Sequence, residues 1–265
     1  CEYSCHDVAP FSLHFNQHAS TAPVSDYSDR HYVSLGYGID FTEELTIMGW
    51  FQPLAADAGF GEQRAFINNA TLTDQKSFVM SGYQDRFGFF LRTDIFSDLN
   101  NGDMNGGWGI SSALISESIN SSGWVHYAIT FDGLVAKMYI NGEPDDVELT
   151  FPNTAVMNII DQSITSISDI VGGGGSVSGN TDNLLFFNKS LTQEEINNLA
   201  FNNQMSHEEY LLAYYKFNKG ADDILYDYSG NAHHGLINGA TWVTNIYGCM
   251  DEYACNYNES ADLDD

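Results

Sequence analysis

Basic residues are scarce in this sequence: 9 lysines and arginines stand against 36 aspartates and glutamates, giving a formal net charge of −27. Nucleic acids and anionic membranes are bound by clustered lysine and arginine, so neither is an expected partner. Apolar runs are also short, and none approaches the roughly 18 residues of a membrane span, which predicts no membrane insertion. No signal peptide is present, so we interpret the chain as a mature protein or a fragment.

Cysteine is absent from the interior of the chain. Cys1, Cys5, Cys249 and Cys255 lie at its two ends, with none between Cys5 and Cys249. A small disulfide-stabilised fold would have cysteines spread along its length. Hydrophobic residues make up 43% of the sequence and aromatic residues 14%, which predicts an ordered apolar core instead. The acidic surplus fits a solvated surface in salty surroundings, or a protein that collects Ca²⁺.

Short alternating or apolar runs separated by turn residues predict many β-strands. From Val125 to Phe131 every second residue is apolar, and Trp50 and Trp124 are expected in the core. Asn141-Gly142 is a strong hairpin-turn signal. The clearest strand segments are 11–16, 45–51, 87–92, 124–131, 135–140, 184–187, 211–217 and 236–243.

This spacing predicts an all-β fold, a two-sheet antiparallel jelly-roll sandwich formed by residues 11–245 as one domain. One short helix is expected, because Thr192 and Glu195 are spaced as a capping box ahead of an apolar stripe. Asp227, followed by Ser229, predicts an Asx-type turn.

Six segments, taken in order, resemble the laminin-G-like domains of bacterial surface proteins, within the concanavalin-A-like superfamily. Trp124 to Gly133, for example, resembles the family's Trp-His-His-x-Ala-x-Thr-Phe-Asp-Gly block. The matching segments are Ser12–Asn16, His31–Leu35, Phe41–Pro53, Trp124–Gly133, Thr181–Ile196 and Ala213–Trp242. The resemblance implies a concanavalin-A-like jelly roll. It also implies a structural Ca²⁺ held by Asn16 and Asp182, although Asn16 stands where the family usually has aspartate.

The two ends resemble a Cys/Asn/Asp-rich motif that punctuates large secreted proteins of Bacteroidetes-like bacteria. Residues 246–265 match the start of that motif and residues 1–10 match its continuation. We therefore expect one unit of a tandem array whose terminal cysteines pair with neighbouring units. An acidic tip at the C-terminal end, which resembles part of a calcium loop, is a second candidate site for Ca²⁺: Asp262, Asp264 and Asp265.

Catalytic motifs are missing as well. Glucanases of this superfamily place two carboxylates on one strand in a Glu-x-Asp-x-x-Glu pattern, which the sequence lacks. The basic cluster of polysaccharide lyases, a Gly-x-Ser-x-Gly elbow and a His-Glu-x-x-His zinc motif are also absent. We therefore expect a chain that is not an enzyme, with a glycoside hydrolase or polysaccharide lyase as the less favoured interpretation.

Sugar ligands stack on exposed aromatic rings beside polar loop residues. Trp108 with Asp103, and Tyr83 beside Gln84, lie in such polar stretches and are the candidate ligand-binding residues. The leading interpretation is an extracellular, cell-surface module of a secreted bacterial protein that binds a glycan or another surface ligand. The alternative is a structural spacer in a filament or stalk, whose partners are neighbouring repeats.

Overall fold

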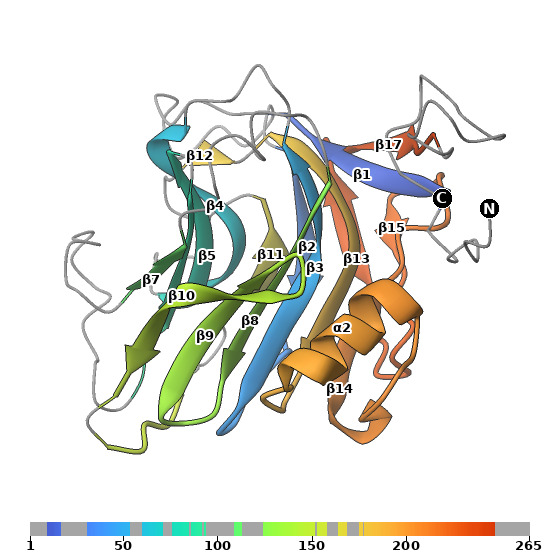
Figure 1. Ribbon diagram of the computed structural model, residues 1–265. Coiled ribbons are helices and arrows are strands. Elements are labelled where there is room, and N and C mark those ends of the chain that lie inside the picture. The colour runs from blue at the N-terminus through green and yellow to red at the C-terminus, as the bar shows by residue number, and fades with distance from the viewer. Residues whose placement is uncertain are drawn as a thin grey trace, which may run out of the picture.

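The computed structural model describes residues 10–16, 31–53, 60–70, 76–84, 86–91, 93, 109–112, 124–151, 153–157, 164–168, 175–176 and 178–246. The backbone alone is described for residues 60–65, 70, 76, 81–84, 86, 90, 109–112, 147 and 175–176. The described strands form two facing sheets, which confirms the predicted all-β sandwich (Figure 1).

One layer is an eight-stranded antiparallel sheet in the order β10-β9-β8-β3-β13-β1-β17, with β14 also paired to β13. Its strands are β1 (Phe11–Phe15), β3 (Leu45–Pro53), β8 (Val125–Phe131), β9 (Val135–Ile140), β10 (Glu143–Thr150), β13 (Gly179–Phe187), β14 (Leu211–Tyr215) and β17 (Thr241–Thr244). Along one edge of β13, β1 pairs with the first half and β14 with the second half. A strand from the start of the domain, β1, and a strand from its later part, β14, therefore both pair with the central strand β13.

The other layer is a nine-stranded sheet in the order β15-β16-β2-β11-β4-β5-β6-β7, to which β12 adds a parallel pairing with β4. Its strands are β2 (Tyr32–Gly36), β4 (Phe60–Ala70), β5 (Lys76–Gln84), β6 (Arg86–Leu91), β7 (Gly109–Ser112), β11 (Ile164–Ile167), β12 (Gly175–Ser176), β15 (Ile224–Leu225) and β16 (Gly235–Asn238).

The main core lies between the two sheets and is rich in aromatic rings. The predicted inward face of β8 is confirmed, because Val125, Tyr127, Ile129 and Phe131 all belong to this core. Burying a phenylalanine or isoleucine side chain contributes roughly 1.5–3 kcal/mol, so this layer is the main source of stability. The prediction that Trp50 lies in the core is wrong, because Trp50 lies outside this core and packs edge-on against Phe201 of the helix.

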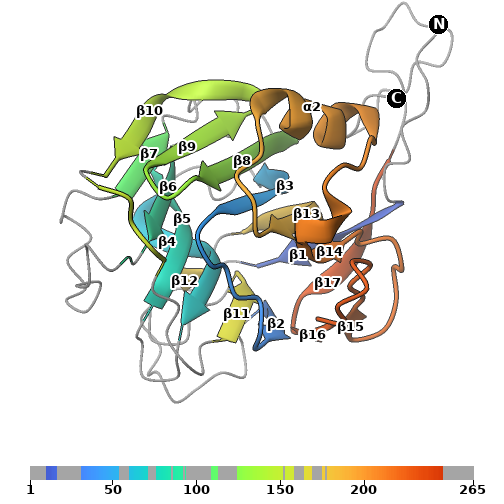
Figure 2. The ribbon, with the colours of Figure 1, turned by 90° about the horizontal axis from the view of Figure 1, so that it is seen from below.

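The predicted helix is α2 (Gln193–Asn202), which lies on the face of the eight-stranded sheet turned away from the other sheet (Figure 2). Ile196 and Leu191 pack there against residues of β3, β8, β13 and β14 as a second apolar layer. The predicted capping box is confirmed: Thr192 accepts from the Glu195 N–H, and Glu195 accepts from the Thr192 N–H. In the described residues no α-helix is long and apolar enough to cross a membrane.

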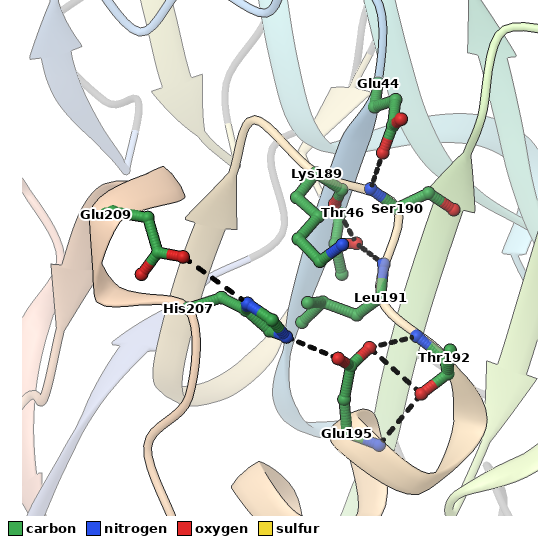
Figure 3. Close-up of polar contacts among 9 residues, drawn as sticks. All are labelled: Glu44, Thr46, Lys189, Ser190, Leu191, Thr192, Glu195, His207 and Glu209. Atoms are coloured by element: carbon green, nitrogen blue, oxygen red, sulfur yellow. Dashed lines mark hydrogen bonds and ion pairs between the residues drawn. The ribbon is translucent and has the colours of Figure 1, made fainter.

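The chain just before α2 is fixed to the start of β3 (Figure 3). The Thr46 hydroxyl donates to the Lys189 carbonyl at 2.6 Å and accepts from the Leu191 N–H at 2.9 Å. Ser190 N–H donates to Glu44 Oε2 at 2.8 Å. These hydrogen bonds fix the chain between the end of β13 and the start of α2.

The turn between β9 and β10 has the geometry that its Asn-Gly pair predicts. Asn141 and Gly142 both have positive φ, 50° and 82°, as a type I′ turn requires. A Cβ at Gly142 would lie 2.1 Å from Asn197 Oδ1, because α2 rests on this turn. Glycine is therefore needed here twice, for its backbone conformation and for the close approach of the helix.

The tail of the sandwich crosses between the layers. The sequence predicts one strand over 236–243, but the structure divides it into β16 in the nine-stranded sheet and β17 in the eight-stranded sheet. The break falls at Asn238-Gly239, where Gly239 has a φ of 71°. This second Asn-Gly pair therefore lies where the chain passes from one sheet to the other. Strands of the tail form an edge of each sheet, β17 in the eight-stranded sheet and β15 in the nine-stranded sheet.

Candidate functional site

Most residues predicted to bind ligands lie outside the described residues. These are Trp108 and Asp103 of the ligand candidates and Asp262, Asp264 and Asp265 of the calcium candidates. The cysteines predicted to form junctions, Cys1, Cys5, Cys249 and Cys255, also lie outside the described residues. Tyr83 lies in β5, where its backbone pairs with Arg86 of β6. The predictions made for these residues stay predictions.

Asn16 and Asp182, the predicted calcium pair, are not brought together. In the β1–β13 ladder Phe15 faces Gly179 and Leu13 faces Thr181. Continuing this register, Asn16 lies four positions, or roughly 13 Å, from Asp182 along the ladder. Calcium–oxygen distances are about 2.3–2.6 Å, so the two side chains do not share an ion in this arrangement.

The Asp182 carboxyl is buried beside a β-bulge in β13, where it is 2% exposed. Its Oδ1 accepts from the Asn183 N–H at 2.7 Å, and its Oδ2 accepts from the Asn245 amide at 3.5 Å. Burial raises the pKa of Asp182 well above its usual value, although the Asn183 hydrogen bond opposes that shift. In the described part of the chain no group of three or more His, Cys, Asp or Glu side chains forms a metal-ligand set.

A second buried titratable group lies under the helix. His126 of β8 is fully buried, and its ring packs against Trp50 and Phe201 at centroid distances of 5.3 and 5.6 Å. Burial lowers the pKa of His126 to about 3, so the imidazole is neutral at physiological pH. His126 is therefore packed as a buried residue of β8.

In the tail, two segments meet at one isolated antiparallel bridge and present tyrosines on the outer face. Tyr215 bridges Asp227, and the Tyr228 N–H donates to the Tyr214 carbonyl at 2.8 Å. Because strand residues alternate between faces, Tyr215 and Asp227 point inward, whereas Tyr214 and Tyr228 share the outer face. Lys216 and Tyr226 follow the same alternation. We call the four residues of this face, Tyr214, Lys216, Tyr226 and Tyr228, the tyrosine ribbon.

Asp227 holds the tyrosine ribbon together from beneath. Its carboxylate accepts from the N–H of Tyr214, the N–H and hydroxyl of Ser229 and the N–H of His233, at distances from 2.8 to 3.0 Å. The Ser229 contacts confirm the predicted Asx-type turn. Four hydrogen bonds to one buried carboxylate fix the backbone that presents the tyrosines.

Lysines lie across the rings of the tyrosine ribbon. The Lys216 ammonium is 5.2 Å from the ring centroid of Tyr214 and 5.5 Å from that of Tyr228, which is cation–π geometry. Lys219 lies 4.1 Å from the Tyr226 centroid and also forms an ion pair with Asp222 at 2.7 Å. Tyr228 is 48% exposed, so one ring of the ribbon is open to a ligand.

The tyrosine ribbon lies close to the calcium candidate. The Tyr214 hydroxyl donates to Asn183 Oδ1 at 3.3 Å, next to Asp182 in the bulge. Burial, together with the negative charge of Asp182, raises the pKa of Tyr214 to about 12. The sequence predictions missed this surface. The strand predicted over 211–217 indicated that Tyr214 and Tyr215 lie on opposite faces, but nothing in that pattern indicated that Tyr228 lies beside Tyr214.

A comparison with solved structures finds the following similarities. A candidate carbohydrate-binding protein from Bacteroides ovatus shares the fold with a TM-score of 0.61 and 14% identity, over 89% of this chain and 60% of that protein. A heptameric SAP-like pentraxin from Limulus polyphemus gives a TM-score of 0.47 and 17% identity, over 76% of this chain and 86% of the pentraxin. This chain therefore spans about 60% of the Bacteroides ovatus protein.

The sequence itself places the chain in a family. No curated protein matches it closely enough to count as a relative. Residues 28–197, more than half of the chain, match the sequence model Laminin_G_3, described as Concanavalin A-like lectin/glucanases superfamily. The match spans the strands that form most of both sheets, from β2 to β13, and the start of α2. The chain therefore belongs to the laminin-G-like family of the concanavalin A-like lectin/glucanase superfamily.

Proposed function

We propose that this chain is a non-catalytic glycan-binding module whose ligand stacks on the tyrosine ribbon. The supporting observation is the pair of tyrosines, Tyr214 and Tyr228, placed side by side, with Tyr214 partly buried and Tyr228 48% exposed. Aromatic rings bind the C–H faces of sugars, and nearby polar groups fix the orientation of the ligand. Here Lys216 and Asn218 provide those groups.

The test is a glycan array followed by calorimetry on the strongest ligand, with the Tyr228→Ala and Tyr210→Ala variants compared. Tyr210 is a matched control because it is 44% exposed and a lysine lies over its ring. It is not part of the tyrosine ribbon, because it lies four residues before Tyr214 in the sequence. We expect Tyr228→Ala to weaken binding about tenfold or more, since stacking on an aromatic ring and its hydrogen bonds are lost together.

Tyr210→Ala should leave the affinity within about twofold of the parent chain. An equal loss in both variants would show that the ligand binds elsewhere. A parent chain that binds no glycan on the array would overturn the proposed function itself.

Calcium is a separate proposal, which rests on the family resemblance and on the buried Asp182 carboxyl. The described residues alone do not complete the 6–8 oxygen ligands that Ca²⁺ takes, because Asn16 lies too far along the ladder. Asp182 is therefore the residue on which the calcium proposal depends. When bound, the ion would neutralise a carboxylate that has no cationic partner among its described contacts.

We further propose that the module works outside the cell, as an adhesive part of a larger bacterial surface protein. Extracellular action is typical of laminin-G-like and carbohydrate-binding domains. The proposal of neighbouring repeats rests on the terminal cysteine-rich segments alone.

A further inference from the structure

Lys216 is distinctive on the tyrosine ribbon because its charge is not neutralised. Its described contacts are the two tyrosine rings, at 5.2 and 5.5 Å, and among the described residues no carboxylate or carbonyl accepts from its ammonium group. Lys219, by contrast, is paired with Asp222, and Lys137 on β9 is paired with Glu148 at 3.9 Å. The chain has only 9 basic residues and a net charge of −27. Lys189, which lies over the Tyr210 ring at 5.7 Å, is the other described lysine with an aromatic ring and no acidic partner among its described contacts.

A second hydrogen-bond donor lies beside it. Asn218 uses its carbonyl oxygen to accept from the Tyr228 hydroxyl at 2.9 Å, so its amide N–H groups point away from that bond. The Lys216 ammonium therefore lies over the Tyr228 ring, Asn218 lies at the hydroxyl of that ring, and Tyr228 is 48% exposed. A site that offers a ring face and donors matches a sugar that carries an acceptor with negative charge.

We propose that the tyrosine ribbon selects a sugar ring bearing a carboxylate, such as a uronic or sialic-type acid, and that Lys216 binds that carboxylate. This inference rests on the proposed glycan-binding function and names the chemistry of its ligand. The pyranose ring stacks on Tyr228, and its carboxylate takes hydrogen bonds from Lys216 and Asn218.

The net charge of the chain limits the size of the acidic ligand. A charge of −27 repels a long polyanion, which brings many negative groups to the protein at once. At physiological ionic strength the screening length is about 8 Å, so a single carboxylate at the ribbon responds mainly to the lysines beside it. We therefore expect one acidic sugar at the end of a mostly neutral glycan, in preference to a polyuronate.

The experiment compares three oligosaccharide probes by calorimetry: one ending in glucuronic acid, one ending in sialic acid, and one ending in glucose as the neutral match. The variants are Lys216→Gln, Lys216→Arg and the control Lys137→Gln, which removes the same charge from a distant strand. Lys216 is partly exposed, so Lys216→Gln is expected to fold, and the thermal melting of each variant checks this.

The expected result has three parts. At least one acidic probe binds the parent chain about tenfold or more tightly than the neutral probe, since a charge-assisted hydrogen bond is at stake. Lys216→Gln removes that preference, so that the acidic and neutral probes then bind with affinities within about twofold of each other. Lys216→Arg retains it, because a guanidinium group also stacks on aromatic rings and binds carboxylates, and Lys137→Gln has no effect.

Two results would overturn the inference while leaving glycan binding intact. One is equal affinity of the parent chain for the neutral and acidic probes, and the other is an unchanged acidic preference in Lys216→Gln. If no probe binds and the glycan array is also blank, the proposed function fails together with this inference.

Discussion

At the scale of single residues, Asp182 is an acid in a setting that favours its neutral form. Its folded pKa is raised by burial above that of an unfolded aspartate, about 3.9. The folded state then binds the proton more tightly than the unfolded state. The free energy of unfolding therefore falls as the pH rises above about 3.9 and toward the raised pKa.

The Asp182→Asn variant tests this account in calcium-free buffer. An amide keeps the shape and the hydrogen bond from Asn183 but cannot ionise, so we expect a flatter dependence of stability on pH and a higher Tm near pH 7. Each kcal/mol gained corresponds to about 2–4 °C in a chain of this size. Thermal melting from pH 4 to 8 measures the difference, and a variant that is less stable at pH 7 with an unchanged pH slope would contradict it.

The same variant separates calcium from simple burial. If Ca²⁺ binds at Asp182, added calcium raises the Tm of the parent chain, EDTA reverses the gain, and Asp182→Asn responds to neither. A parent chain whose Tm does not change with EDTA, and which carries no metal by elemental analysis, would reject the calcium proposal.

At the scale of elements, helix α2 is held at its first turn by a compact network (Figure 3). Glu195 bonds to Thr192 within the capping box and to the His207 ring, which comes from the loop after the helix. Burial by itself would raise the pKa of Glu195, but the hydrogen bonds from the Thr192 N–H, His207 and the Thr192 hydroxyl lower it. The start of α2 and the loop that follows it are therefore both bonded to one carboxylate.

Thr192→Ala removes the hydroxyl that caps the first turn of α2. We expect a loss of about 1 kcal/mol in the free energy of unfolding, typical for a helix cap. Thr192→Ser, which keeps the hydroxyl, should retain most of the stability of the parent chain. Urea denaturation measures both variants, and equal losses would show that the methyl group of Thr192 matters more than its hydroxyl.

At the scale of the whole molecule, local sequence patterns predicted the helix and the strands better than they predicted which elements pack against each other. The alternation from Val125 to Phe131 and the Thr192–Glu195 box depend on neighbouring residues, so both were predictable. The separation of Asn16 from Asp182 depends on the β1–β13 register. The position of Trp50 under α2 depends on a contact between residues far apart in the sequence. The pairing of Tyr214 with Tyr228 depends on how the chain turns between them. Sequence periodicity shows that a strand has two faces, but not what covers each one.

The four terminal cysteines provide a prediction for the isolated chain. If they normally pair with neighbouring units, we expect thiol titration under denaturing, non-reducing conditions to find free thiols, or gel filtration to find disulfide-linked dimers. Two closed disulfides within one chain would contradict the interpretation of these segments as junctions. Reduction should leave the Tm of the sandwich nearly unchanged, because residues 11–245 contain no cysteine.

The pairing of β1 with β17 has a mechanical consequence. Phe11 faces Thr244 and His14 faces Thr241, so the residues that lead into β1 and out of β17 lie at the same end of one antiparallel ladder. Tension applied through those two points would open the ladder one hydrogen bond at a time, as a zipper opens, rather than shear all of its bonds at once. Zipper loading yields at low force, so a domain pulled in this way would give first at its β17 edge. That edge belongs to the tail that carries the tyrosine ribbon, and stretching the chain would disturb the ligand site before it disrupted the core.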